Sequence, residues 1–193
     1  LHLCDYNLES IDTTSTTHKL LLEVCMAAKY EGNSIETPYI IHKQTNEGTA
    51  SQLCTVLARS FADIGDIVRG RDLFHGNPQE KEKREDLEKK LKEIFGDIYK
   101  ELSTTKNGAQ TYYQDKSGGN FFKLREDWWT VNRDQVWKAM TCSEKLANAS
   151  YFRPTCNGVE RTKGYCRCGD GKSKGANADQ VPTYFDYVPQ YLR

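Results

Sequence analysis

Three groups of residues in this sequence have types and spacings that could support chemistry, and the first is a cysteine cluster. Cys156 is followed by Cys166 and Cys168, and His75 could serve as a distant fourth ligand for zinc. Structural zinc sites use cysteine pairs separated by about two to four residues, whereas a single residue separates Cys166 from Cys168. The spacing therefore favours disulfides over a metal site, and we expect no cofactor.

The second candidate is a cysteine nucleophile with a histidine partner, but the four histidines lie in unlike contexts and no signature flanks a cysteine. The third is the carboxylate pair of Asp63 and Asp66, a spacing that would suit a hydrolase. Arg59 and Arg69 lie four and three residues away, where helical neighbours can neutralise the carboxylates. We therefore interpret the four charges as structural ion pairs and predict that the chain is not an enzyme.

These four charges belong to a stretch whose apolar residues recur every three or four positions. That period predicts a helix over about 50–69, with Gly65 and Gly70 leaving its end uncertain. Between other helices its charges would have to be paired, because a buried unpaired charge costs several kcal/mol. The apolar positions are Leu53, Val56, Leu57, Phe61, Ile64, Ile67 and Val68.

The same period predicts further helices near 18–30, 79–102 and 121–141, and hence an all-α fold. Pro38 and Gly48 favour a stretch over 33–48 that is mostly loop, in which Tyr39–His42 could be helical or buried. The Gly-punctuated stretch 103–120 is typical of a surface loop. The helix at 121–141 carries all three tryptophans, Trp128, Trp129 and Trp137. We expect them in the core, with a ligand-binding aromatic box as the alternative.

Composition narrows the function further. Lys and Arg number 27 against 27 Asp and Glu, which argues against a general nucleic-acid binder. Mean hydropathy is −0.75, and no apolar run approaches the roughly 18 residues of a membrane span. We expect no membrane insertion by this segment. The sequence starts without Met or a signal-like segment, so we expect a fragment of a longer protein.

Seven cysteines indicate an oxidising, extracellular setting. We expect Cys142, at the end of the tryptophan-rich helix, to pair with Cys54 or Cys25. The odd number leaves at least one cysteine free or paired outside the chain, and we expect one of Cys4, Cys166 and Cys168 to lack a partner here. The disulfide candidates are Cys25, Cys54, Cys142, Cys156, Cys166 and Cys168.

Three blocks of this sequence resemble one known family. They are ARSFADIGDIVRGRDLF within 53–74, FFKLREDWWTVNRDQVWKAMTC at 121–142 and PTYFDYVPQYLR at 182–193. They resemble the Duffy-binding-like domains, alpha type, of the erythrocyte membrane protein 1 family of the malaria parasite Plasmodium falciparum. The resemblance implies a helical bundle with a disulfide-pinned, loop-rich C-terminal stretch. It divides the chain into the end of a loop-rich subdomain (1–15), a helical-bundle subdomain (16–150) and a cysteine-containing loop that leads into another helical subdomain (151–193).

The resemblance also implies an adhesion function on the extracellular face of the infected erythrocyte, within a larger membrane-anchored protein. Such domains bind host-cell receptors or glycans, and the alpha type is associated with rosetting through heparan sulfate, complement receptor 1 or blood-group sugars. It further implies antigenic variation and recognition by antibodies. The alternative is an antigenically variable spacer, in which a neighbouring domain holds the receptor.

Two basic surfaces could hold an anionic or sulfated glycan through charge. The first carries a net charge of three positive over fifteen residues. It consists of Arg161, Lys163, Arg167, Lys172 and Lys174, against Glu160 and Asp170. The second is the Lys/Arg face of the helix at 79–102, with Arg69 and Arg71 near it.

Overall fold

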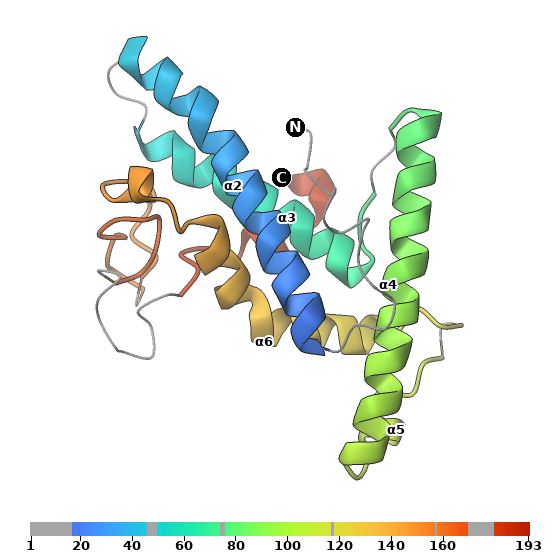
Figure 1. Ribbon diagram of the computed structural model, residues 1–193. Coiled ribbons are helices and arrows are strands. Elements are labelled where there is room, and N and C mark those ends of the chain that lie inside the picture. The colour runs from blue at the N-terminus through green and yellow to red at the C-terminus, as the bar shows by residue number, and fades with distance from the viewer. Residues whose placement is uncertain (1–16, 46–49, 74–75, 117, 157, 170–179) are drawn as a thin grey trace.

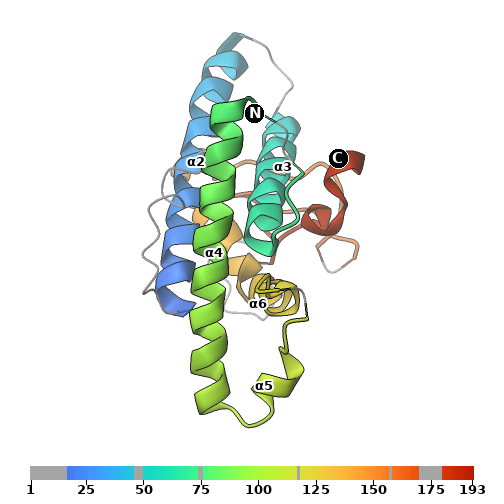
Figure 2. The same cartoon turned by 90° about the vertical axis from the view of Figure 1, so that its right-hand side faces the viewer.

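The structure is a computed structural model that describes residues 17–45, 50–73, 76–116, 118–156, 158–169 and 180–193, with only the backbone for 38–45 and 50–51. Within these residues it contains helices and two isolated β-bridges and no strand, which confirms the all-α prediction. Helices α2, α3 and α6 pack against one another, and α4 stands beside them with its lower half next to α6 (Figures 1 and 2).

Helix α2 (Thr17–Thr45) is much longer than the predicted helix at 18–30, so the loop prediction for 33–48 is wrong as far as Thr45. A glycine weakens a helix, and Gly32 lies just beyond the end predicted at residue 30. In the fold Gly32 is interior to α2 and lies against the end of α6, where a Cβ would meet the Met140 carbonyl oxygen at 2.1 Å. Close helix packing, not termination, is what this glycine permits.

Helix α3 (Ala50–Arg69) is the central helix, as predicted. It continues through Gly65, which accommodates the Trp129 indole at 2.8 Å from a hypothetical Cβ. It ends at Gly70, whose φ of 70° closes the helix while the Arg71 N–H donates to the Asp66 carbonyl at 2.8 Å. Of the two glycines, only the one with a left-handed backbone stops the helix.

The remaining helices follow the sequence more closely. Helix α4 (Pro78–Thr105) starts with a capping box, because Asn77 accepts from the Glu80 N–H and the Glu80 carboxylate accepts from the Asn77 N–H. The short α5 (Ala109–Tyr112) lies in the stretch predicted as a surface loop. Helix α6 (Phe122–Met140) matches the tryptophan-rich prediction. Three single 3-10 turns complete the described chain: η1 (Glu144–Leu146), η2 (Phe185–Tyr187) and η3 (Gln190–Leu192).

The core is built around the rings of α3 and α6. Phe61 of α3 lies 5.1 Å from the Trp129 ring and 5.2 Å from the Trp137 ring, centroid to centroid. Trp128 packs edge-on against Phe95 of α4 at 6.1 Å. All three tryptophans are buried, so none offers a face to a ligand, and they stand where the core interpretation placed them.

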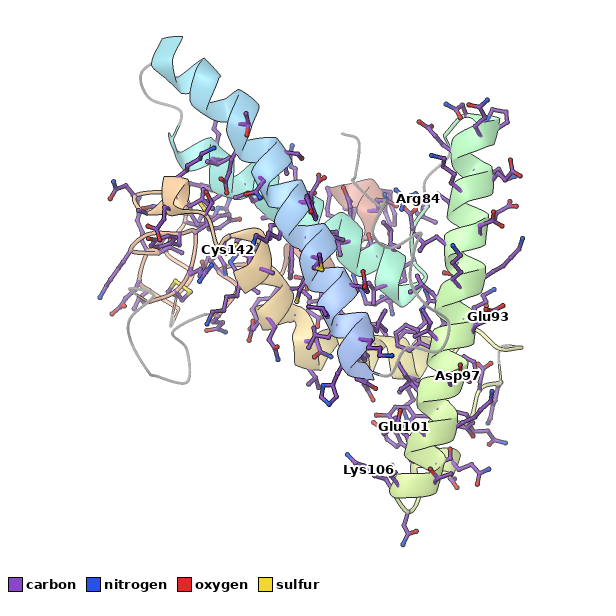
Figure 3. All side chains as sticks on the ribbon, in the orientation of Figure 1. Arg84, Glu93, Asp97, Glu101, Lys106 and Cys142 are labelled. Carbon is purple, nitrogen blue, oxygen red and sulfur yellow. A yellow bond between two sulfur atoms is a disulfide. The ribbon has the colours of Figure 1, made fainter. Side chains whose placement is uncertain are left out.

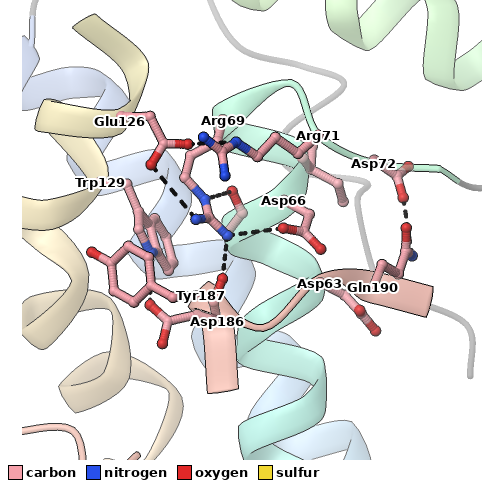
Figure 4. A network of polar contacts seen from close by, with 12 residues as sticks. Asp63, Asp66, Arg69, Arg71, Asp72, Glu126, Trp129, Asp186, Tyr187 and Gln190 are labelled. Carbon is pink, nitrogen blue, oxygen red and sulfur yellow. Dashed lines mark hydrogen bonds and ion pairs between the residues drawn. The ribbon is translucent and has the colours of Figure 1, made fainter. Parts of the chain in front are cut away.

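The C-terminal segment 184–193 is tied to α3 and α6 by a buried polar network. Asp186 is 1% exposed and accepts from Trp129 Nε1 at 2.9 Å and from Arg133 Nε and Nη2 at 2.8 and 2.7 Å. The Asp186 carbonyl accepts from Arg69, which also pairs with Asp66 at 2.8 Å (Figure 4). These contacts fix the position of the 184–193 segment against α3 and α6.

The predicted ion pairs are thus present in part. Asp66 pairs with Arg69, as the spacing indicated, but the pairing of Asp63 with Arg59 is wrong. Asp63 instead contacts Arg193 at 3.4 Å, and Arg193 also pairs with Asp66. Arg59 is exposed and forms no ion pair among the described residues. The terminal arginine, brought in by the 184–193 segment, takes the place that Arg59 was expected to fill.

Replacing Arg133 by Met should lower the free energy of unfolding by about 3–5 kcal/mol, because the Asp186 carboxylate would lose its buried counter-charge. Urea unfolding followed by circular dichroism measures this change. The matched control is Arg71→Met. It removes an ion pair of 2.7 Å with Glu126 whose arginine is 59% exposed, and it should cost less than about 1 kcal/mol. Equal losses in the two variants would contradict the role given to Asp186.

Candidate ligand-binding surface

Residues 142–156 and 158–168 fold back onto the start of α3, where one disulfide fixes them, and a second disulfide lies within the segment. Cys54 of α3 is bonded to Cys166, 112 residues later, and Cys156 is bonded to Cys168. The Trp137 indole N–H donates to the Cys166 carbonyl at 3.1 Å. Cys156, Cys166 and Cys168, which were considered as zinc ligands, are therefore all in disulfides. The Cys54–Cys166 bond and the Trp137 hydrogen bond anchor the segment to the core.

The backbone of this segment makes a sharp turn before Cys166. Tyr165 and Cys166 both have left-handed φ values, 53° and 52°, which are unusual for residues other than glycine. Hydrogen bonds hold the turn: the Tyr165 N–H donates to Leu146 O at 2.7 Å and its hydroxyl to Glu144 at 2.8 Å. The hydrogen bond to Glu144, followed by burial, raises the pKa of Tyr165 above its usual value. The strained turn directs Cys166 toward Cys54.

Arg161 and Lys163 are both exposed on this disulfide-bonded segment. Thr162 between them is 3% exposed, and its hydroxyl accepts from the Tyr151 N–H at 2.6 Å. The buried middle side chain anchors this stretch, and the side chains on either side of it are exposed. The structure thus brings together two of the five predicted glycan-binding residues.

Arg167 does not belong to that surface, so the prediction that it binds glycan is wrong. Its side chain is buried and donates to the Thr141 hydroxyl at 2.7 Å, the Thr141 carbonyl at 2.7 Å and the Lys138 carbonyl at 2.8 Å. The guanidinium caps the C-terminus of α6, where carbonyls are left without helical partners. Lys172 and Lys174 lie outside the described residues.

The face of α4 does not provide the second basic surface. The helix carries seven Lys and Arg against eight Asp and Glu, and Glu93, Asp97 and Glu101 lie on its lower half (Figure 3). Four of its lysines are paired with acids on the same helix, for example Lys100 with Asp97 at 2.9 Å. Arg69 is buried, and Arg71 pairs with Glu126 at 2.7 Å. A face of mixed, paired charges has no net attraction for an anion.

Arg125 is a structural residue that the sequence argument missed. It is fully buried, donates to the carbonyls of Ile67 and Val68, and makes a two-pronged contact of 2.7 and 2.8 Å with Glu88. It thereby joins the end of α3 to α4 and α6. No periodicity marks such a residue, because an arginine on a helix is ordinarily exposed.

The predicted pairing of Cys142 with Cys54 or Cys25 is wrong. Cys142 is exposed just beyond α6 (Figure 3), Cys25 is half-buried, and both are free thiols. Cys54 is bonded to Cys166, because the turn at Tyr165 brings that residue over the start of α3. We expected one of Cys4, Cys166 and Cys168 to lack a partner. Cys166 and Cys168 both form disulfides, and Cys4 lies outside the described residues.

Comparisons with known proteins agree on one family. The Duffy binding domain family matches residues 1–193. The crystal structure of the NTS-DBL1(alpha-1) domain of Plasmodium falciparum membrane protein 1, varO strain, is 44% identical with a TM-score of 0.75, over 99% of this chain and 40% of that chain. The ICAM-1-binding DBLbeta domain of PfEMP1 IT4var13 is 32% identical with a TM-score of 0.68, over 100% of this chain and 39% of that chain.

This chain therefore spans about two fifths of those two solved structures. A search of curated proteins finds no match. Among the described residues no helix is long and apolar enough to cross a bilayer.

The two free thiols should react at very different rates with iodoacetamide at pH 8. Burial raises the pKa of the Cys25 thiol to about 11, so about a thousandth of it is thiolate at that pH. Exposed Cys142 should be modified first. Peptide mapping over time measures both sites, and Cys142→Ser should leave the slow Cys25 reaction unchanged. Recovery of Cys142 in a disulfide with Cys54 or Cys25 would contradict the connectivity described here.

Proposed function

The chain belongs to the Duffy binding domain family, and on that premise we propose that it is an adhesion module that binds a ligand on the host-cell surface. A DBLbeta domain 30% identical to this chain has been solved bound to ICAM-1, which supports a host receptor as the class of partner. We place the module on the extracellular face of the infected erythrocyte, as part of a longer surface protein. Its disulfides are consistent with that oxidising setting.

The observation that carries the choice of ligand is the exposed pair Arg161 and Lys163, held outward on a disulfide-bonded segment. The chain is net neutral, so it has no long-range field, and attraction for an anion must come from such a local group of charges. We therefore propose an anionic, preferably sulfated, glycan as the ligand. Lys172 and Lys174 complete the proposed group, whereas Arg167 is omitted because it caps α6.

The second candidate function is an antigenically variable spacer, in which a neighbouring domain grips the receptor and antibodies recognise exposed loops of this one. The exposed turn around Gly158 to Glu160 fits both proposals. Direct binding by the 193-residue chain separates them, because a spacer would not be retained by glycan.

Replacing Arg161 and Lys163 by Gln should weaken binding to immobilised heparin about five- to thirty-fold. Each lost exposed contact is worth about 0.5–1 kcal/mol. The salt concentration at elution from a heparin column measures the loss, because exposed charge contacts are screened by salt. Adding Lys172→Gln and Lys174→Gln should lower it further.

The matched control is Lys81→Gln with Lys100→Gln, which removes the same charge from the mixed face of α4 and should elute near the wild type. If the control elutes as early as the Arg161 and Lys163 variant, retention reflects overall charge and not this surface. If the wild type is not retained at all, the spacer proposal takes over.

A further inference from the structure

A cleft of about 900 Å³ opens where the outer side of α3 meets the C-terminal tail. Thr55 and Arg59 of α3 form one wall, and the segments 151–155 and 180–185 form the others. Two wall residues are adjacent to disulfide-bonded cysteines, Thr55 to Cys54 and Thr155 to Cys156. Two of the three walls are therefore held in place before any ligand arrives, which reduces the entropy lost on binding.

The charge of the cleft is positive. Arg59 and Arg153 line it, both are exposed, and neither forms an ion pair within the described part of the chain. None of the described lining residues is Asp or Glu. Two acidic side chains near it, among the described residues, are already engaged. Asp186 is bound by Arg133 and Trp129, while Asp134 accepts from the Val181 N–H and lies 3.8 Å from Arg133.

Aromatic rings stand beside these charges. Phe152 is 43% exposed and Tyr184 64% exposed, although both line the cleft. The Arg153 guanidinium lies over the Phe152 ring at 5.2 Å, which orients its donors beside an apolar surface. Arg133 lies 5.3 Å from the Tyr184 ring centroid and supports that ring from the core side.

The cleft also carries hydrogen-bonding groups suited to hydroxyls. Thr55, Thr155 and Thr183 line it together with Gln180. The Thr183 hydroxyl accepts from the Phe185 N–H at 3.1 Å, which leaves its own proton available as a donor. A ligand with a flat apolar ring face, several hydroxyls and one negative charge would match these walls. An acidic peptide side chain would use the arginines but leave the threonines and the rings without partners.

We propose that this cleft binds one anionic sugar unit, its carboxylate or sulfate held by Arg59 and Arg153 and its ring face packed on Phe152 and Tyr184. The inference deepens the proposed glycan-binding function and rests on it for the class of ligand. It uses none of the residues of the Arg161 and Lys163 surface. Arginine suits the charge, because its planar donors match both carboxylate and sulfate oxygens.

Ligand-observed saturation-transfer NMR on the 193-residue chain tests the proposal with small probes. Glucose 6-sulfate and methyl glucuronide separate sulfate from carboxylate, and methyl glucoside is the neutral control. At least one anionic sugar should bind, and the neutral sugar should bind at least about tenfold more weakly, the loss expected for an unused charge-assisted contact. Arg59→Gln with Arg153→Gln should weaken the anionic sugar by at least about the same factor. Tyr184→Ala should weaken the sugars but not inorganic sulfate.

The control variant Arg161→Gln with Lys163→Gln should bind the small sugars like the wild type, so this proposal and the heparin surface can fail separately. Circular dichroism verifies folding, which the exposed positions of Arg59 and Arg153 should leave intact. The proposal is overturned if the Arg59 and Arg153 variant binds as tightly as the wild type or if the neutral sugar binds equally well. It is also overturned if a tetraglutamate peptide displaces the sugar and binds more tightly through the same arginines.

Discussion

The position of the 184–193 segment depends on the contacts of the buried Asp186 carboxylate. It lies in the core, where a lone negative charge would be costly, and it is compensated by Arg133 and by the indole N–H of Trp129. Its backbone carbonyl engages Arg69 at the end of α3. One residue of a short 3-10 turn thus joins two helices far apart in the sequence, and this contact also holds the neighbouring 180–185 wall of the cleft near α3.

Two buried arginines extend the same principle to the helix ends. Arg125 binds the final carbonyls of α3 and Arg167 those of α6. Each satisfies acceptors that a helix leaves open at its C-terminus and places positive charge at the negative end of the dipole. The number of arginines in the sequence therefore overestimates the positive charge on the surface, because several guanidinium groups are buried. Among the cations that stay exposed, Arg161 and Lys163 lie on the disulfide-bonded segment and Arg59 lies on the outer side of α3.

Parts of the site were accessible to sequence reasoning and parts were not. Arg161 and Lys163 could be named because a polar, Gly-rich stretch places its charged residues in solvent. Arg167, four residues after Lys163, looked the same but is buried, since only the fold reveals that α6 ends beside it. Arg59 was assigned to an intrahelical pair by its spacing from Asp63. Arg193 occupies that carboxylate instead and leaves Arg59 facing the cleft.

Hydrophobic periodicity is a local property of the sequence, so it was enough to predict the helical class, the approximate span of α3, α4 and α6 and the aromatic core. The long motif blocks were enough to indicate the family. Tertiary structure decided which cysteines meet, how far α2 runs and which charges stay in solvent. Gly32 illustrates the difference: in sequence a glycine weakens a helix, but in the fold it lets α2 approach the Met140 carbonyl closely. Disulfide partners and buried ion pairs join residues up to 130 positions apart, and no local pattern encodes that proximity.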